Sequence, residues 1–246
     1  MNNRRSWKQM IVFTLITVMM VGCDGAVIEP TATPTVPPSP TPLSSVTILE
    51  SALATMEEVE SYHFEMVLQM VISSEGTTME VPLTFIGYFK APDRLRGELT
   101  MELLGQMMET ELISIGEISY IKDPTSGEWQ MSTESATPFT PEDFVGLEPD
   151  DVANMVDLIL IGEENLDGVP VYHLEGKVPT ESMGNVLGEV DGEIKVEYWI
   201  GVEDDLIRRV DVEMELFEVG GDQQELNATL SFLFSEFNKE ITIEAP

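Results

Sequence analysis

The sequence predicts an α+β domain in which a large, curved antiparallel sheet forms a half-open β-barrel wrapped around a few helices, enclosing an apolar cavity. Two observations carry this prediction. Segments that alternate apolar and polar residues recur along the 246-residue chain, separated by turn dipeptides such as Asp167-Gly168 and Asp191-Gly192. A few other stretches show the apolar spacing of a helix instead.

Residues 1–22 precede this domain and are typical of a lipoprotein signal peptide. A basic region that contains Arg4, Arg5 and Lys8 comes before an apolar run over 10–21, which is too short for the roughly 20 residues that span a bilayer. The only cysteine, Cys23, follows Gly22 where this run ends, as in a bacterial lipobox. We expect Cys23 to carry a diacylglyceryl group; the alternative is an ordinary secretory peptide whose cysteine falls there by chance.

Residues 23–45 predict an extended stalk. The segment 29–45 is rich in Pro, Thr and Ser and has almost no residue able to build a core. Such composition favours polyproline II, which rises about 3.1 Å per residue, so the stalk can reach up to roughly 70 Å from its anchor.

The domain proper is expected over 46–246 and begins with a helix. Apolar residues recur at helical spacing from Val46 to Val59, and Ser44 or Ser45 is a suitable N-cap. Period-two alternation then predicts antiparallel strands with one apolar and one wet face. These segments are 62–72, 79–85, 95–103, 194–200, 210–216 and 226–232, within a sheet of about ten strands.

Two further helices are expected to cover one side of the sheet. In 149–161, Pro149 suits the first helical position and Gly162 ends an apolar stripe that includes Met155 and Ile159. In 180–187, Thr180 can cap a short helix followed by Gly188.

The charge of the chain excludes several partners. The formal net charge is −33, and after cleavage before Cys23 nine basic residues remain against 45 acidic ones, which leaves −36. Phosphate binding needs clustered Lys and Arg, so nucleic acid is not an expected partner, and an anionic membrane surface would repel the domain. Asp204-Asp205 and Glu163-Glu164 are acidic pairs, but none has the spacing of an EF-hand loop. We therefore predict no metal ligand and no cofactor.

An enzyme is not expected either. The chain has no GxSxG, P-loop or HExxH motif. Its two histidines, His63 and His173, fall on the polar faces of predicted strands. We predict a protein without catalytic residues.

The chain has 15 methionines, mostly on inward-facing positions. Methionine is unbranched and polarizable, so a wall of methionines adapts to irregular partners, although plain core packing is the alternative for each one. Apolar-face positions of strands and helices point at one interior, so they predict a lipid-binding cavity. Its expected lining is Phe64, Met66, Leu68, Phe85, Met101, Met155, Ile159, Met183, Leu187 and Met214.

A series of short motifs resembles the LppX/LprAFG lipoprotein family, whose fold is shared with the lipoprotein carriers LolA and LolB. No single motif is specific, but they run in family order across nearly the whole domain. The motifs are 91–97, 115–120, 123–129, Pro138-Phe139 with Pro141, 167–169 with 172–174, 198–201, Asp205-Leu206 with Arg208-Arg209, and 234–238 with Ile241.

The resemblance implies a half-barrel around a central helix, an apolar cavity and no catalytic residues. It also implies binding or transfer of acylated lipid, glycolipid or lipoprotein cargo on the extracytoplasmic side of the cell membrane, with an envelope transporter as a further partner. Trp129, Tyr198 and Trp199 either rim the cavity or anchor the packing. The alternative function is a cell-surface structural or protein-binding module with a filled core and no lipid cargo.

Overall fold

The computed structural model describes residues 44–74, 77–103, 105–133, 152, 155–180, 191–217 and 224–246. All of them belong to one compact unit, residues 42–246. The expected signal peptide, Cys23, most of the stalk and the expected helix beyond Thr180 lie outside the described residues.

The first helix is confirmed as α1 (Ser45–Glu57). Ser44 is its N-cap, because the Ser44 hydroxyl accepts a hydrogen bond from the Thr47 backbone nitrogen at 3.1 Å. The buried face of α1 carries Ile48, Leu49, Ala52 and Leu53. Val46 is exposed, so the stripe that faces the core begins one turn later than the sequence indicates.

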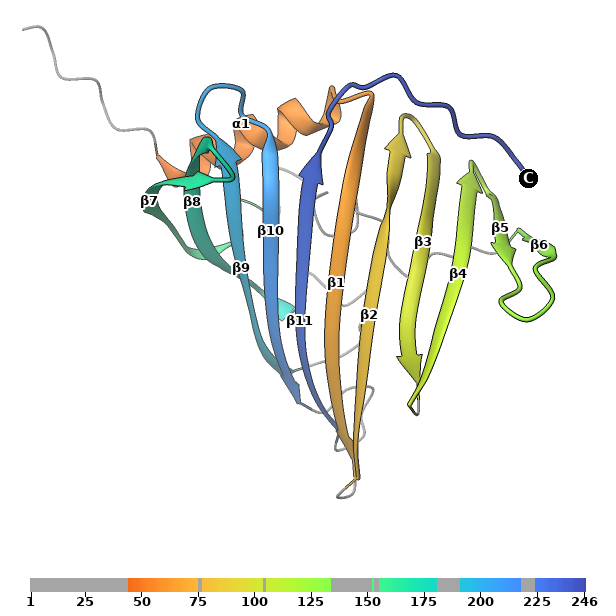
Figure 1. Cartoon of the computed structure of the whole chain (residues 1–246). Helices are drawn as coiled ribbons and strands as arrows, with labels where there is room; N and C mark the ends of the chain where they lie inside the picture. The colour runs from red at the N-terminus through yellow and green to blue at the C-terminus, as the bar shows by residue number, and fades with distance from the viewer. Residues whose placement is uncertain are drawn as a thin grey trace, which may run out of the picture. The chain divides into compact units, whose positions relative to one another are not determined.

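In the described residues, eleven strands form one open antiparallel sheet, which confirms the predicted sheet architecture (Figure 1). Their order across the sheet is β6-β5-β4-β3-β2-β1-β11-β10-β9-β8-β7, so among the described strands β6 and β7 lie at the two edges. Two chain segments, β1–β6 and β7–β11, are each paired in sequence order and meet where β1 pairs with β11. The bounds are β1 (Ser61–Ser74), β2 (Thr77–Lys90), β3 (Arg94–Leu103), β4 (Gln106–Ile115), β5 (Ile118–Lys122), β6 (Trp129–Ser132), β7 (Val156–Leu166), β8 (Val169–Val178), β9 (Asp191–Gly201), β10 (Ile207–Phe217) and β11 (Gln224–Ser235).

The prediction of a helix over 149–161 is wrong for residues 156–161, because these residues belong to β7. The spacing of Met155, Val156 and Ile159 fits a helical stripe, but Val and Ile are β-branched and favour strands. Pairing with β8 supplies the backbone hydrogen-bond partners, with two register irregularities within β7.

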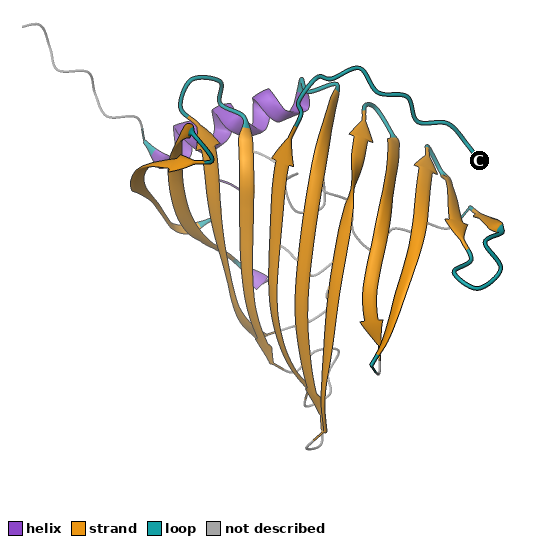
Figure 2. Cartoon of the chain, viewed as in Figure 1, coloured by secondary structure: helices purple, strands orange, loops and turns teal. Residues whose placement is uncertain are grey.

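The helix α1 runs across one end of the sheet, as the purple ribbon in Figure 2 shows. It packs against β7, β9 and β10, and the Ser45 hydroxyl donates a hydrogen bond to the Leu158 carbonyl oxygen at 2.8 Å. We call the face of the sheet that packs with α1 in the hydrophobic core the inner face, and the opposite one the outer face. In the described part of the chain, α1 is the one helix with defined bounds, so a layer of several helices is not confirmed.

Candidate functional site

A continuous row of side chains crosses the inner face from the β7 edge to β3. Strand register places one residue from each of eight neighbouring strands in this row, which we call the inner row. Seven of the eight are apolar, and the exception is a tyrosine. In spatial order the row is Leu160, Leu174, Tyr198, Val210, Phe232, Met66, Phe85 and Leu99.

Aromatic contacts surround the middle of the inner row. The rings of Phe64 and Phe85 meet edge to face with centroids 5.1 Å apart. Phe232 stacks on Phe234 at 5.8 Å. Such pairs add to the burial energy of the rings, and together they form a tightly packed apolar floor on this part of the inner face.

Methionines lie beside this floor on the inner face of β1 to β4. Met101 pairs with Met108, Met70 pairs with Val81, and Met79 pairs with Ile72. Met79 and Met108 are 39% and 41% exposed, and Met70 and Met101 are partly buried against the core. We call Met70, Met79, Met101 and Met108 the methionine wall. The inner face is therefore not covered throughout, and its accessible part carries flexible apolar side chains.

Tyr198 is the polar member of the inner row. Its side chain is fully buried, and its hydroxyl has no hydrogen-bond partner among the residues that the structure describes. Burial raises the pKa of the Tyr198 hydroxyl, so the group stays protonated and able to donate a hydrogen bond.

Most of the residues predicted to line a cavity share the inner face. Phe64, Met66, Leu68, Phe85 and Met214 are buried there, and Met101 is partly buried. Met155 also packs against the core, since an added Cβ at Gly176 would lie only 2.7 Å from the Met155 methyl carbon.

One of the predicted residues lies off that face, and two others are not described. Ile159 pairs with Glu175 on the outer side of β8 and is 50% exposed, so it lies apart from the buried set. Met183 and Leu187 lie outside the described residues, so their placement stays a prediction.

Met70, Met79 and Met108 were missed as candidate site residues, and Tyr198 was considered only as a rim or packing residue. Met70, Met79 and Tyr198 stand in period with buried neighbours of their strands, so the alternation already contained this signal. The aromatic residues weighed as rim positions fall on different faces. Tyr198 is on the inner face, whereas Trp199 stacks on His173 with ring centroids 4.4 Å apart, among the charged side chains of the outer face.

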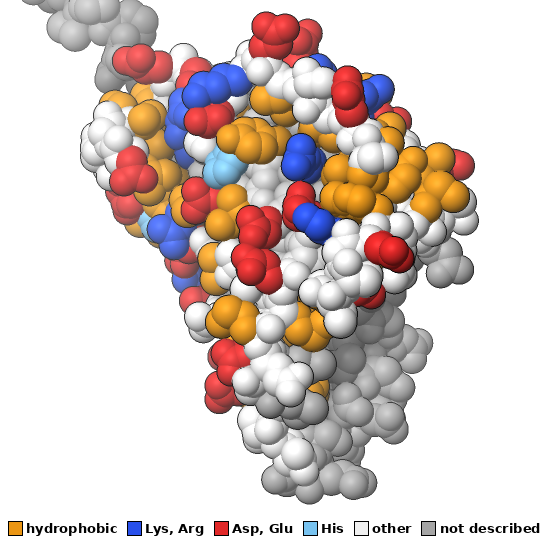
Figure 3. Space-filling model, turned by 45° about the vertical axis from the view of Figure 1, so that its right-hand side comes forward, with side chains coloured by type: hydrophobic (Ala, Val, Ile, Leu, Met, Phe, Trp, Pro, Cys, Tyr) orange, Lys and Arg blue, Asp and Glu red, His pale blue; other side chains and the backbone are white. Residues whose placement is uncertain are grey.

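The outer face is charged, and acidic, basic and hydrophobic side chains intermingle on the side shown in Figure 3. His173 Nδ1 lies 2.9 Å from Glu164 Oε1, and His173 Nε2 lies 2.9 Å from Glu197 Oε2. Hydrogen bonds from His173 and from Trp199 Nε1 lower the pKa of Glu164. This network joins β7, β8 and β9 and keeps carboxylates ionised on the outer side of the sheet.

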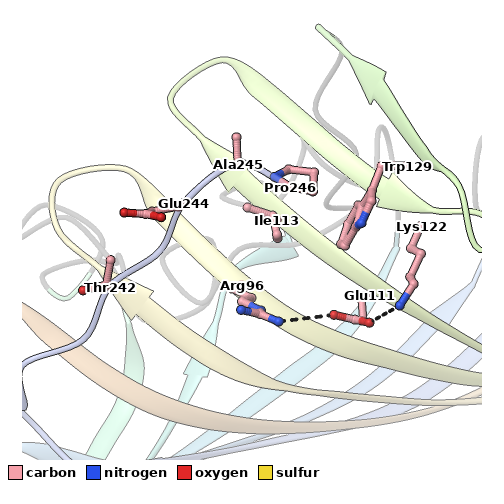
Figure 4. Close-up of a pocket in the computed structure, with 9 residues that line it drawn as sticks. All are labelled: Arg96, Glu111, Ile113, Lys122, Trp129, Thr242, Glu244, Ala245 and Pro246. Carbon is pink, nitrogen blue, oxygen red and sulfur yellow. Dashed lines mark hydrogen bonds and ion pairs between the residues drawn. The ribbon is translucent and has the colours of Figure 1, made fainter.

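A polar pocket of about 440 Å³ also lies on the outer side, near β3 to β5 (Figure 4). Glu111 lies between Arg96 at 3.4 Å and Lys122 at 2.5 Å, and the Lys122 hydrogen bond lowers the pKa of Glu111. Paired charges do not suit an acyl chain, so the inner face is the candidate site for an apolar ligand. The pocket is lined by Arg96, Glu111, Ile113, Lys122, Trp129, Thr242, Glu244, Ala245 and Pro246.

Within the described ranges, no group of three or more His, Cys, Asp or Glu residues is arranged to hold a metal ion. Asp205 instead accepts a hydrogen bond from Ser51 at 2.9 Å, and Asp204 pairs with Arg208. None of the helices in the part of the chain that the structure describes combines the length and hydropathy needed to cross a membrane.

The sequence model of the LppX_LprAFG lipoprotein family matches residues 44–243, and the chain belongs to this family. The resemblance inferred from the motifs is thereby confirmed. No curated protein matches the chain in sequence.

The solved structures with a similar fold include two mycobacterial lipoproteins. Lipoprotein LppX of Mycobacterium tuberculosis is 13% identical over 81% of this chain and 98% of its own, with a TM-score of 0.56. LprF from Mycobacterium bovis is 13% identical over 82% of this chain and 96% of its own, with a TM-score of 0.54. At this identity the likeness defines an LppX-like fold and nothing further.

Proposed function

We propose that the protein is an envelope lipoprotein that binds the acyl chains of lipid, glycolipid or lipoprotein cargo on the inner face of its sheet and transfers them. Residues 1–22 are removed, Cys23 carries the membrane anchor, 23–45 form the stalk and 46–246 hold the cargo. Membership of a lipoprotein family supports the anchor. The observation that carries the binding function is the methionine wall, which leaves apolar side chains accessible beside the mostly buried inner row.

The energetics suit a carrier. Each buried CH₂ group gains about 0.8 kcal/mol relative to water, but a chain inside a bilayer already has the same gain. Exchange between a membrane and the inner face is therefore close to neutral, which allows both loading and release. Six of the eight residues in the inner row are buried, whereas the methionines beside it are partly accessible, so cargo enters from the methionine wall.

The direct test is the recovery of bound lipid by mass spectrometry from protein isolated without detergent. The chain from Asp24 onward suits this test, because it keeps the whole compact unit and lacks the anchor cysteine. We expect non-covalently bound acyl lipid in the wild-type sample. A sample free of lipid would contradict the carrier function and favour the surface module that binds protein partners.

A matched pair of variants locates the site. Met101→Trp adds volume on the inner face and should lower the amount of bound lipid several-fold, because the indole competes with an acyl chain for space. Met107→Trp makes the same change on the outer face of β4, where Met107 is 74% exposed, and should leave bound lipid unchanged. Equal lipid content in the two variants would show that the methionine wall is not part of the binding site.

A further inference from the structure

The buried hydroxyl of Tyr198 is the polar exception in the inner row. Leu174 and Val210 flank Tyr198 in the row, and all three side chains are fully buried. None of the described residues offers the hydroxyl a hydrogen-bond partner. A buried donor without an acceptor destabilises the folded state. Phenylalanine would fill the same space without this cost. The presence of the hydroxyl at this position therefore indicates a hydrogen-bond acceptor on a bound ligand.

We propose that the Tyr198 hydroxyl donates a hydrogen bond to the carbonyl oxygen of the ester or amide that joins an acyl chain to its cargo. This inference rests on the proposed function and specifies the cargo as an acyl lipid rather than an ether lipid or a hydrocarbon. A neutral carbonyl fits the apolar surroundings, because a free carboxylate in the same place would require the burial of a charge.

The position of Tyr198 in the row fits this role. Tyr198 lies two strands inside the β7 edge, about 10 Å at the usual strand spacing. Leu160 at that edge is 38% exposed, so a polar headgroup can stay near solvent while the carbonyl reaches Tyr198. From β9 to β3 the row continues for about 24 Å, and every further member is apolar, as a long acyl chain requires.

The test compares two ligands that differ only in the linkage. 1-Palmitoylglycerol carries an ester carbonyl, whereas 1-O-hexadecylglycerol has a poorer ether acceptor at the same position. Dissociation constants are measured by calorimetry with the chain from Asp24 onward. We expect the wild-type protein to prefer the ester by about five-fold, the size of one neutral hydrogen bond, and Tyr198→Phe to bind both ligands equally.

Tyr172→Phe is the matched control, because it removes a hydroxyl from β8 where the side chain is only partly buried. It should retain the ester preference. The alternative is that the Tyr198 hydroxyl stabilises the fold, and thermal unfolding of the cargo-free protein tests it separately. We expect Tyr198→Phe to be at least as stable as the wild type. A clear loss of stability would show that the hydroxyl has a partner inside the protein and would overturn the inference.

The remaining outcomes separate this inference from the proposed function. Equal binding of both ligands by the wild type, or an ester preference that survives in Tyr198→Phe, overturns the role of Tyr198 while acyl-chain binding stands. Binding of neither ligand overturns both.

Discussion

Glu197 shows how single residues on the outer face are kept charged in a strongly acidic protein. Burial raises the pKa of its carboxyl group, but hydrogen bonds from Lys195 Nζ at 2.6 Å and from His173 outweigh this effect. The pKa of Glu197 is therefore lowered, and that of Lys195 is raised by its hydrogen bonds to Glu197 and Glu175. Local hydrogen bonds therefore keep the Glu197 carboxyl group ionised, although desolvation and the net negative charge of the protein both favour its protonation.

Glu197→Gln should lower the free energy of unfolding at pH 7 by about 1–2 kcal/mol, because it removes charge-assisted hydrogen bonds from a partly buried group. The pKa of Glu197 is lower in the folded state, so its stabilising contribution is present above the unfolded value and is lost as the pH falls through the folded value. In urea denaturation, the loss of unfolding free energy caused by Glu197→Gln should therefore be largest at pH 7 and shrink as the pH is lowered below the usual range of a glutamate carboxyl group.

Glu215→Gln is the control for that prediction. Glu215 is exposed on β10, and removal of its charge should be neutral or slightly stabilising, since it reduces repulsion in an acidic protein. If Glu197→Gln behaves in the same way as Glu215→Gln, the network around His173 contributes nothing to stability.

The sequence predicts faces at the residue scale but not partners. The period-two pattern around His173 places the ring on a polar face, as the structure has it. Its partners Glu164 and Glu197 come from β7 and β9, and their alignment depends on strand register. A run of alternating residues contains no information about register between strands that loops of different length connect, so this network was not predictable.

At the scale of elements, α1 and β7 show where local patterns suffice and where they fail. The start of α1 is encoded locally, because Ser44 caps the helix that its own sequence favours. The strand β7 is an edge with apolar residues on both sides, so it lacks the alternation of a half-buried strand. Its apolar positions also fit a helix, and pairing with β8 decides between the two.

Because β7 is more exposed than β8, truncation of an apolar side chain should lower the free energy of unfolding less in β7 than in β8. Ile159→Ala should cost less than about 1 kcal/mol, since half of the side chain already contacts water, whereas Leu174→Ala should cost about 2–5 kcal/mol because Leu174 is fully buried. Urea denaturation of the two variants measures both values. Equal losses would instead place Ile159 in the core, as the predicted helix required.

At the scale of the whole molecule, the sheet is made of two segments that meet at β1 and β11. The register there pairs Met66 with Phe232, residues far apart in the chain, and this pairing makes the inner row continuous. Composition and periodicity predicted an open antiparallel sheet with an apolar face, because both follow from local alternation. The order of the strands, and hence the place of Tyr198 among its neighbours, depends on long-range pairing that no local pattern encodes.

The proposed anchor is the remaining feature that acts on the whole molecule. One acyl chain holds a protein to a membrane only marginally and two or more hold it stably, so a diacylglyceryl group on Cys23 should suffice for a domain that anionic surfaces repel. Cys23→Ser should abolish the incorporation of labelled palmitate and prevent lipoprotein processing. Thr35→Ser, a change within the stalk, should retain the label and remain in the membrane fraction after a carbonate wash. Palmitate incorporation by the Cys23→Ser protein equal to that of Thr35→Ser would contradict an anchor at Cys23.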